Sequence, residues 1–168
     1  MKLPLRGPEP FTAAHDVATF ACGSDALNRF PQRHALNNQR NQSARTYVAL
    51  RGETRVVGYY TMAAASAEFD FVPARLAKGL ARHPIPLILL ARLAVDSTEQ
   101  GAGLGAGLLK DALKRFLQAQ AIIAARALVV QAKDERAAAF YRHFGFAPSP
   151  IDASHLFLMT KDIHASML

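Results

Sequence analysis

The 168-residue sequence predicts a mixed α/β fold, in which helices cover both faces of a mixed, mostly antiparallel sheet. Two strand patterns flank a turn at residues 51–54, and strands joined in this way pair antiparallel. Further along, strand and helix patterns alternate, which is typical of strands that pair in parallel. Neither a linker nor an internal repeat divides the sequence, so we expect a single domain over residues 1–168.

Helix and strand signals in the first half are bounded by turn residues. Ser24 or Asp25 can accept hydrogen bonds from the amides of a first helical turn. We therefore expect a helix that begins there, contains Pro31 early and continues to about Gln39. An alanine-rich run at residues 62–67 has small side chains, as if another group packs closely over it. The other expected elements are an irregular segment at 11–18, strands at 46–50 and 56–69, and a short helix within a proline-containing loop at 71–86.

A glycine-rich turn joins an apolar strand at residues 87–96 to a strongly periodic helix. The apolar face of this helix comprises Leu104, Leu108, Leu109, Ala112, Leu113, Phe116 and Leu117. Gly101, Gly103 and Gly105 lack a Cβ, so the backbone can approach a phosphate closely and adopt a positive φ. Several amide groups also lie at the positive end of the helix, where an anion is favoured. The turn therefore predicts a phosphate-bearing ligand.

Two well-known glycine loops do not fit this turn. A nucleotide-binding P-loop requires Gly-Lys-Ser/Thr, whereas Ala-Gly follows Gly105 here. A dinucleotide-binding loop lies in the first strand–helix unit and is followed by an acidic residue roughly 20 positions later. This turn comes late in the chain, and residues 124–126 read Ala-Ala-Arg.

A second candidate site follows one strand–helix unit later. Residues 126–132 predict a buried strand, and Asp134 is a good N-cap for a helix over 135–144 that stops at Gly145. The helix carries an aromatic run that includes Tyr141. An alternative is that its aromatic residues form a packed face of the core, comprising Ala137, Phe140, Tyr141 and Phe144. We expect a last strand near residues 155–161.

The charge distribution predicts a polyanionic partner. The formal net charge is +7, with a pI of about 10.0. No acidic residue occurs between Asp25 and Glu53, or between Asp70 and Asp96. We expect nucleic-acid contacts from the cations in these segments, although a solvated basic face is the alternative. The candidates are Arg29, Arg33, Arg40, Arg45, Arg75, Lys78, Arg82 and Arg92.

Composition excludes several other classes of protein. With 51% apolar and 20% charged residues, the chain is expected to fold as a soluble domain. No apolar stretch approaches the roughly 20 residues that cross a bilayer, and Met1–Pro10 does not resemble a signal peptide. The lone Cys22 suits a reducing cytoplasm, and the histidines show no metal-ligand spacing, so we expect no metal site.

The spacing Gln100-x-x-Gly103-x-Gly105 resembles the acyl-CoA loop of the GNAT superfamily of N-acetyltransferases, and the run Phe140–Phe146 resembles its second signature. The resemblance implies a GNAT-like fold with acetyl-CoA as cosubstrate. It also implies that Tyr141 is the general acid that protonates the leaving thiolate. The backbone of Leu93, Ala94 and Val95 would hold the pantetheine arm like an added strand. The remaining implied cofactor-binding residues are Gln100, Gly101, Ala102, Gly103, Leu104, Gly105, Asp134, Ala137 and Phe140.

Segments between residues 20 and 160 also resemble the TacT-like GNAT toxins of bacterial type II toxin–antitoxin modules. These segments include Phe20–Ser24, Ala44–Val48, Val57–Tyr60 and Leu90–Asp96. The resemblance implies acetyl transfer to the α-amino group of aminoacyl-tRNA, which blocks translation in the bacterial cytoplasm. It further implies a ribbon–helix–helix antitoxin as partner. Because dimers are the commonest oligomers, we expect a homodimer.

Two questions stay open at the level of the sequence. A GNAT enzyme that acetylates a small-molecule amine or a protein N-terminus could carry a basic surface incidentally. A degenerate CoA-binding module is a further alternative, although the joint presence of the glycine loop and Tyr141 argues against it. The sequence shows no obvious general base, because Asp96 and Glu99 beside the loop could equally be structural.

Overall fold

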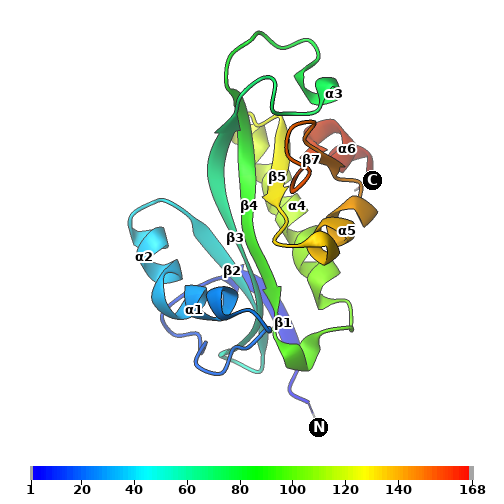
Figure 1. The fold of residues 1–168 in the computed structure, drawn as a ribbon. Helices are drawn as coiled ribbons and strands as arrows, with labels where there is room; N and C mark the ends of the chain where they lie inside the picture. Colours follow the sequence, from blue (N-terminus) through cyan, green and yellow to red (C-terminus); the bar gives the residue numbers. More distant parts are fainter. Residues whose placement is uncertain (1, 167–168) are drawn as a thin grey trace. The chain divides into compact units, whose positions relative to one another are not determined.

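The computed structural model describes residues 2–166 and has the mixed α/β architecture that the sequence predicts (Figure 1). Its strands are β1 (Leu5–Pro10), β2 (Arg45–Arg51), β3 (Arg55–Ala67), β4 (Ile85–Val95), β5 (Ala127–Gln131), β6 (Ala147–Pro148) and β7 (His155–Met159). Its helices are α1 (Asp25–Arg33), α2 (Ala35–Arg40), α3 (Ala74–Ala77), α4 (Leu104–Ile122), α5 (Glu135–His143) and α6 (Thr160–Ser166), with a 3₁₀ turn at Ser97–Glu99. No helix within the described range is long and apolar enough to cross a membrane.

The strands belong to one seven-stranded sheet in the order β1-β2-β3-β4-β5-β7-β6. β1, β2 and β3 pair antiparallel, as do β5, β7 and β6. β4 and β5 pair in parallel, with Leu87 opposite Ala127 and Leu90 opposite Val130. Parallel neighbours require a long crossover connection, and α4 supplies it between β4 and β5.

The contacts divide the chain into two compact units, and β3, β4 and α4 contribute residues to both. The first unit consists of the chain up to Ala63 together with Ala91–Ala112. In it, Ser24 caps α1 by accepting a hydrogen bond from the Leu27 amide, as the sequence predicts. Its core contains Phe11, Phe20, Phe30, Ala35, Val48, Leu50, Val56, Tyr59 and Ala94.

The second unit consists of Ala64–Leu90 together with the chain from Leu113 onward. Here the segment that contains α3 covers one face of the sheet. Its core contains Val72, Leu76, Ala77, Ile85, Leu87, Ala127, Val129, Phe157 and Met159. The opposite faces of β5 and β7 present Leu128, Val130, Leu156 and Leu158, which are also buried.

The structure corrects the predicted elements in three places. β1 was not expected, because its prolines argue against a strand; they are tolerated since β1 lies at the edge of the sheet. The first helix does not continue unbroken to Gln39 but is interrupted at His34, between α1 and α2. The last strand ends at Met159 rather than near Lys161, because β5 begins opposite Met159 and offers no further partner.

Candidate active site

The glycine turn lies directly before α4, which begins at Leu104. Gly101 and Gly103 have φ angles of +81° and +89°, which residues with a side chain rarely adopt. A Cβ on either glycine would meet nothing within 4 Å, so the space beside the turn is open. The Gly107 amide donates to the Gly103 carbonyl, whereas the amides of residues 104–106 have no acceptor in the part of the chain that the structure describes.

This geometry fits the pyrophosphate of acetyl-CoA. Unpaired amides at a helix N-terminus donate to phosphate oxygens, and α4 has no acidic residue in its first turn that would offset the helix dipole. A side chain at position 101 or 103 would occupy the open space that a phosphate requires. The local sequence accounts for this arrangement, because glycine alone adopts the two positive φ angles without strain.

Two buried carboxylates hold the segment that leads into the glycine turn. The Oδ1 atom of Asp96 accepts a hydrogen bond from the Ala21 amide (2.9 Å), and its Oδ2 atom accepts one from the Thr98 amide (3.0 Å). Glu99 accepts two hydrogen bonds from the guanidinium of Arg51, at 2.8 and 3.1 Å. These contacts fix the approach to the turn from two distant parts of the first unit, at Ala21 and Arg51, and from the neighbouring Thr98.

The same partners keep both carboxyl groups ionised. Hydrogen bonds from Arg51 lower the pKa of Glu99, although burial opposes them. Burial acts to raise the pKa of Asp96, but hydrogen bonds to Thr98 and to the Ala21 amide, together with the nearby charge of Arg55, lower it overall. Because their oxygen atoms are held by fixed partners, Asp96 and Glu99 position the turn and are poorly placed to accept a proton from a substrate.

Gln100 fastens the glycine turn to the end of β4. Its Nε2 atom donates to the carbonyls of Val95 (2.9 Å) and Cys22 (3.2 Å). The residues Leu93–Val95 lie beyond Leu90, the last β4 residue in the described register with β5. β4 therefore continues past the paired region and ends beside the turn.

Tyr141 lies in α5, in the second unit. The helix begins at the N-cap Asp134, whose Oδ1 atom accepts a hydrogen bond from the Ala137 amide (2.8 Å). The ring of Tyr141 is 8% exposed and packs edge-on against Phe140 and Phe146. Burial raises the pKa of Tyr141 to about 12. Its hydroxyl bonds to no other residue among those described, so it is free to donate.

The structure also tests whether the aromatic run is only a packed face. α5 buries Ala138 and Tyr141, while Ala137 and Phe140 are half-buried. Phe144 is 38% exposed. The packed face is therefore not the stripe that the sequence suggested, and Tyr141 is its one large buried side chain.

The predicted cofactor-binding residues fall into two groups, one in each unit. The glycine turn, Gln100 and Leu93–Val95 lie together in the first unit. Asp134, Ala137, Phe140 and Tyr141 lie together on α5 in the second unit. Each group lies within a short stretch of sequence, so local motifs and the resemblance to the GNAT family could point to it.

The predicted nucleic-acid contacts differ in their availability. Arg29, Arg33 and Arg40 on α1 and α2 are exposed and form no ion pair with any residue from 2 to 166. Arg45 is exposed, and its guanidinium donates a hydrogen bond to the side chain of Gln42 at 3.4 Å. These four cations belong to the first unit and are free to meet phosphate groups.

Three other predicted cations have protein partners. Arg75 donates two hydrogen bonds to Asp162, at 2.6 and 2.9 Å. Arg82 donates to Asp70 at 2.7 Å and lies over the ring of Phe69. Lys78 is exposed.

Arg92 is the third cation with a partner. Its guanidinium stacks 3.9 Å from the centre of the Phe30 ring, which ties β4 to α1.

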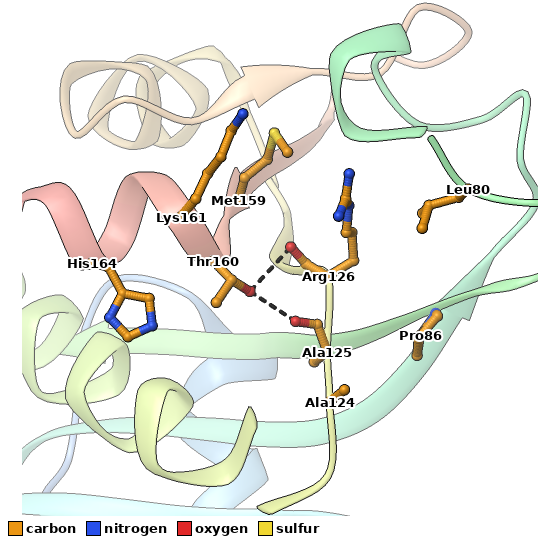
Figure 2. A pocket seen from close by; sticks show the side chains of 9 residues that line it. All are labelled: Leu80, Pro86, Ala124, Ala125, Arg126, Met159, Thr160, Lys161 and His164. Carbon is orange, nitrogen blue, oxygen red and sulfur yellow. Dashed lines mark hydrogen bonds between the residues drawn. The ribbon is translucent and has the colours of Figure 1, made fainter. Parts of the chain in front are cut away.

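The structure contains a basic pocket that the sequence did not predict (Figure 2). It has a volume of about 450 Å³, and the side chains of Arg126, Lys161 and His164 surround it together with apolar residues. Thr160 donates to the Ala125 carbonyl at 2.7 Å and connects the two segments that form its floor. These segments are far apart in sequence, so no spacing could indicate the pocket. Within residues 2–166, no group of three His, Cys, Asp or Glu side chains could hold a metal ion.

Comparison with known proteins gives a consistent result. Residues 42–148 match the acetyltransferase (GNAT) domain family. The chain is 42% identical to a tRNA-acetylating toxin of Mycobacterium tuberculosis over 158 residues, which cover 94% of each protein.

Solved structures extend this similarity to the fold. AtaT complexed with acetyl-methionyl-tRNAfMet is 32% identical, with a TM-score of 0.89 over 98% of this chain and 99% of that one. A mutant AtaT toxin bound to the C-terminus of the antitoxin AtaR and acetyl-CoA is 31% identical, with a TM-score of 0.82 over 98% of this chain and 97% of that one.

Proposed function

The chain belongs to the GNAT acetyltransferases, and from this we propose that it is the toxin of a type II toxin–antitoxin pair. In this proposal it transfers acetyl from acetyl-CoA to the α-amino group of aminoacyl-tRNA and thereby blocks translation. The observation that carries the proposal is the 42% identity to a tRNA-acetylating toxin along 94% of both chains. The open glycine turn and the basic surface support it independently.

The glycine turn would hold the pyrophosphate of acetyl-CoA. The amides of residues 104–106 would donate to its oxygens, and Gly101 and Gly103 keep the space beside the backbone open. Gln100 would act mainly by fixing the turn, because its side-chain amide already donates to two carbonyls. The backbone of Leu93–Val95, which lies beyond the register of β4 with β5, would pair with the pantetheine arm.

Tyr141 would act as the general acid. The pKa of about 12 keeps its hydroxyl protonated at neutral pH, and this hydroxyl has no competing acceptor in the described structure. A protonated phenol can donate to the sulfur of the departing thiolate. Asp134, Ala137 and Phe140 on the same helix would flank the cofactor.

Charged tRNA would be attracted by the unpaired arginines of the first unit. Arg29, Arg33 and Arg40 supply positive charge that no carboxylate among residues 2–166 neutralises through an ion pair. Arg45 would add a fourth contact, whereas Arg75 and Arg82 are already neutralised by aspartates. Lys78 and Arg92 would supply further contacts to the tRNA.

We further propose a ribbon–helix–helix antitoxin as the neutralising partner, a homodimer as the assembly and the bacterial cytoplasm as the location. A relative bound to the C-terminus of its antitoxin supports the first of these.

Induced expression in a bacterial host tests the function. The wild type should arrest growth and protein synthesis, and co-expression of the neighbouring antitoxin gene should restore both. Normal growth at high expression of folded protein would contradict the toxin assignment and favour an enzyme that acetylates a small amine or a protein N-terminus.

A further inference from the structure

A cavity of about 460 Å³ lies in the second unit, separate from the pocket of Figure 2. Its apolar lining includes Leu87, Leu89, Val129 and Phe157, which belong to β4, β5 and β7. This volume lies within the roughly 300–1,000 Å³ of typical small-ligand pockets. The small side chains of Ala65 and Ala67 also line it. The alanine-rich run of β3 thus leaves space that larger residues would fill.

A histidine paired with an aspartate lies on the wall of this cavity. The Nδ1 atom of His155 is 2.9 Å from Oδ2 of Asp152, and the ring packs edge-on against Phe71, with centroids 5.0 Å apart. The other oxygen of Asp152 accepts hydrogen bonds from the amide (2.9 Å) and hydroxyl (2.7 Å) of Ser154. Both contacts hold the carboxylate in place, so it orients the imidazole.

The second ring nitrogen of His155 is available to a ligand. Nε2 has no hydrogen-bond partner among the described residues. Every buried side-chain nitrogen and oxygen atom of these residues does have a partner, so Nε2 is not buried and reaches solvent. The side chain is 25% exposed. An imidazole with one nitrogen bonded to a carboxylate and the other open to solvent, on a residue that lines a cavity, is the arrangement of a proton acceptor.

His155 lies at the end of the sheet where a ligand is expected. It pairs with Gln131, the last residue of β5, and α5 with Tyr141 follows β5 within a few residues. Ligands of α/β sheets bind outside the carboxyl ends of the strands. The pocket of Figure 2 lies at the opposite, amino end of β5, beside Ala125 and Arg126.

From this geometry we propose that the cavity receives the aminoacyl group of the acceptor and that His155, oriented by Asp152, removes a proton from its α-amino group. The inference rests on the proposed function and supplies the general base that the sequence did not reveal. The apolar part of the lining suits an aminoacyl group with an uncharged side chain.

The proton balance of the reaction gives such a group a role near neutral pH. An α-amino group with a pKa of about 8 is mostly protonated at neutral pH, and the ammonium form cannot attack a thioester. His155 accepts one proton, the neutral amine forms the N–C bond, and the C–S bond breaks. The nitrogen loses two protons in all: one ends on the sulfur of CoA, and the other passes through His155 to water.

The charges that face His155 favour this role. Asp152 lies in contact with it, and Glu68 and Asp70 line the same cavity from the end of β3 and the loop that follows. Arg82 neutralises Asp70. The remaining carboxylates attract an ammonium group to the cavity before it is deprotonated.

The pH dependence of acetyl transfer to charged tRNA tests the inference. At pH 6.5, His155→Ala should lower kcat/KM about 100-fold, the usual scale for loss of a general base, and the difference should shrink towards pH 8.5 as more amine becomes neutral. Added imidazole should restore activity to this variant. His83→Ala, which removes an exposed histidine of the same unit, should have the wild-type profile. Acetyl-CoA affinity, measured by calorimetry, should be unchanged in both.

Two outcomes would overturn the inference. One is a His155→Ala enzyme that matches the wild type at every pH; the other is a constant loss at all pH values without imidazole rescue. If His155→Ala does not fold, Asp152→Asn decides by the same profile, and its identity with the wild type would overturn the inference. Ala65→Phe, which fills the cavity, should raise the KM for charged tRNA without affecting acetyl-CoA binding. A wild type that acetylates no charged tRNA would instead overturn the proposed function.

Discussion

Replacement of Gly103 by alanine isolates the contribution of the glycine turn. Gly103 has a φ of +89°, and holding a residue with a side chain in this region costs about 1–3 kcal/mol. If the turn of the free variant relaxes to avoid this strain, acetyl-CoA binding must restore the strained conformation, and the cost is subtracted from the binding free energy. Each ~1.4 kcal/mol corresponds to a tenfold change in affinity. Acetyl-CoA should therefore bind roughly 5- to 150-fold more weakly, and the new Cβ adds a direct obstruction in the open space beside the turn.

Calorimetric titration with acetyl-CoA measures this loss, and Gly107→Ala provides a matched control. Gly107 lies one helical turn further into α4, has no positive φ, and has open space around its Cβ position. Alanine should stabilise the helix there by about 1 kcal/mol and leave acetyl-CoA binding intact. Unchanged affinity in folded Gly103→Ala, or equal losses in both variants, would refute the assignment of the turn to the pyrophosphate.

Three further predictions concern the acid, the tRNA surface and the buried ion pair. Tyr141→Phe should bind acetyl-CoA normally but reduce kcat by a factor of about 10²–10⁴ in steady-state assays. Because burial raises the pKa of Tyr141 from 10.0 to about 12, the free energy of unfolding of the wild type should fall as pH rises between these values. Alkaline unfolding followed by circular dichroism should show this fall in the wild type and a smaller one in the variant. Reversal of charge at Arg33 and Arg40 should raise the KM for charged tRNA and flatten its salt dependence, whereas lysine at both positions should preserve them; equal KM values would exclude these contacts. Since Arg51 lowers the pKa of Glu99 below 4.5, their pairing stabilises the fold above this value and is lost as pH falls below it; Glu99→Gln should flatten the acid limb of the unfolding profile, and an unaltered limb would argue against the pairing.

Local signals explain how much of the site could be predicted from the sequence. The glycine turn and the capped helix with Tyr141 are each contiguous, so spacing, helix periodicity and capping residues were sufficient to predict their local structure. The hydrogen bond from Ala21 to Asp96 joins residues 75 positions apart, and the pairing of Arg51 with Glu99 spans 48. Only tertiary structure could assign these two carboxylates a structural role.

The general base was missed for a related reason. Asp152 and His155 are three residues apart, and their pairing is local, but the cavity beside them is assembled from β3, β4, β5 and β7. The strand β1 was missed because prolines weaken a strand pattern, and only its position at the sheet edge makes them acceptable. α6 was missed because the expected last strand ran to about residue 161, past Met159, where the pairing of β7 with β5 ends and the helix begins.

The most direct test of the central claim is acetyl transfer from radiolabelled acetyl-CoA to purified bulk tRNA. With aminoacylated tRNA, label should become bound to the tRNA and should be released by mild base as an N-acetyl amino acid. Deacylated tRNA and a panel of free amines should remain unlabelled, and the Tyr141→Phe variant should label charged tRNA far more slowly. Label that appears only in small amines, or equally in charged and deacylated tRNA, would contradict acetylation of the aminoacyl group.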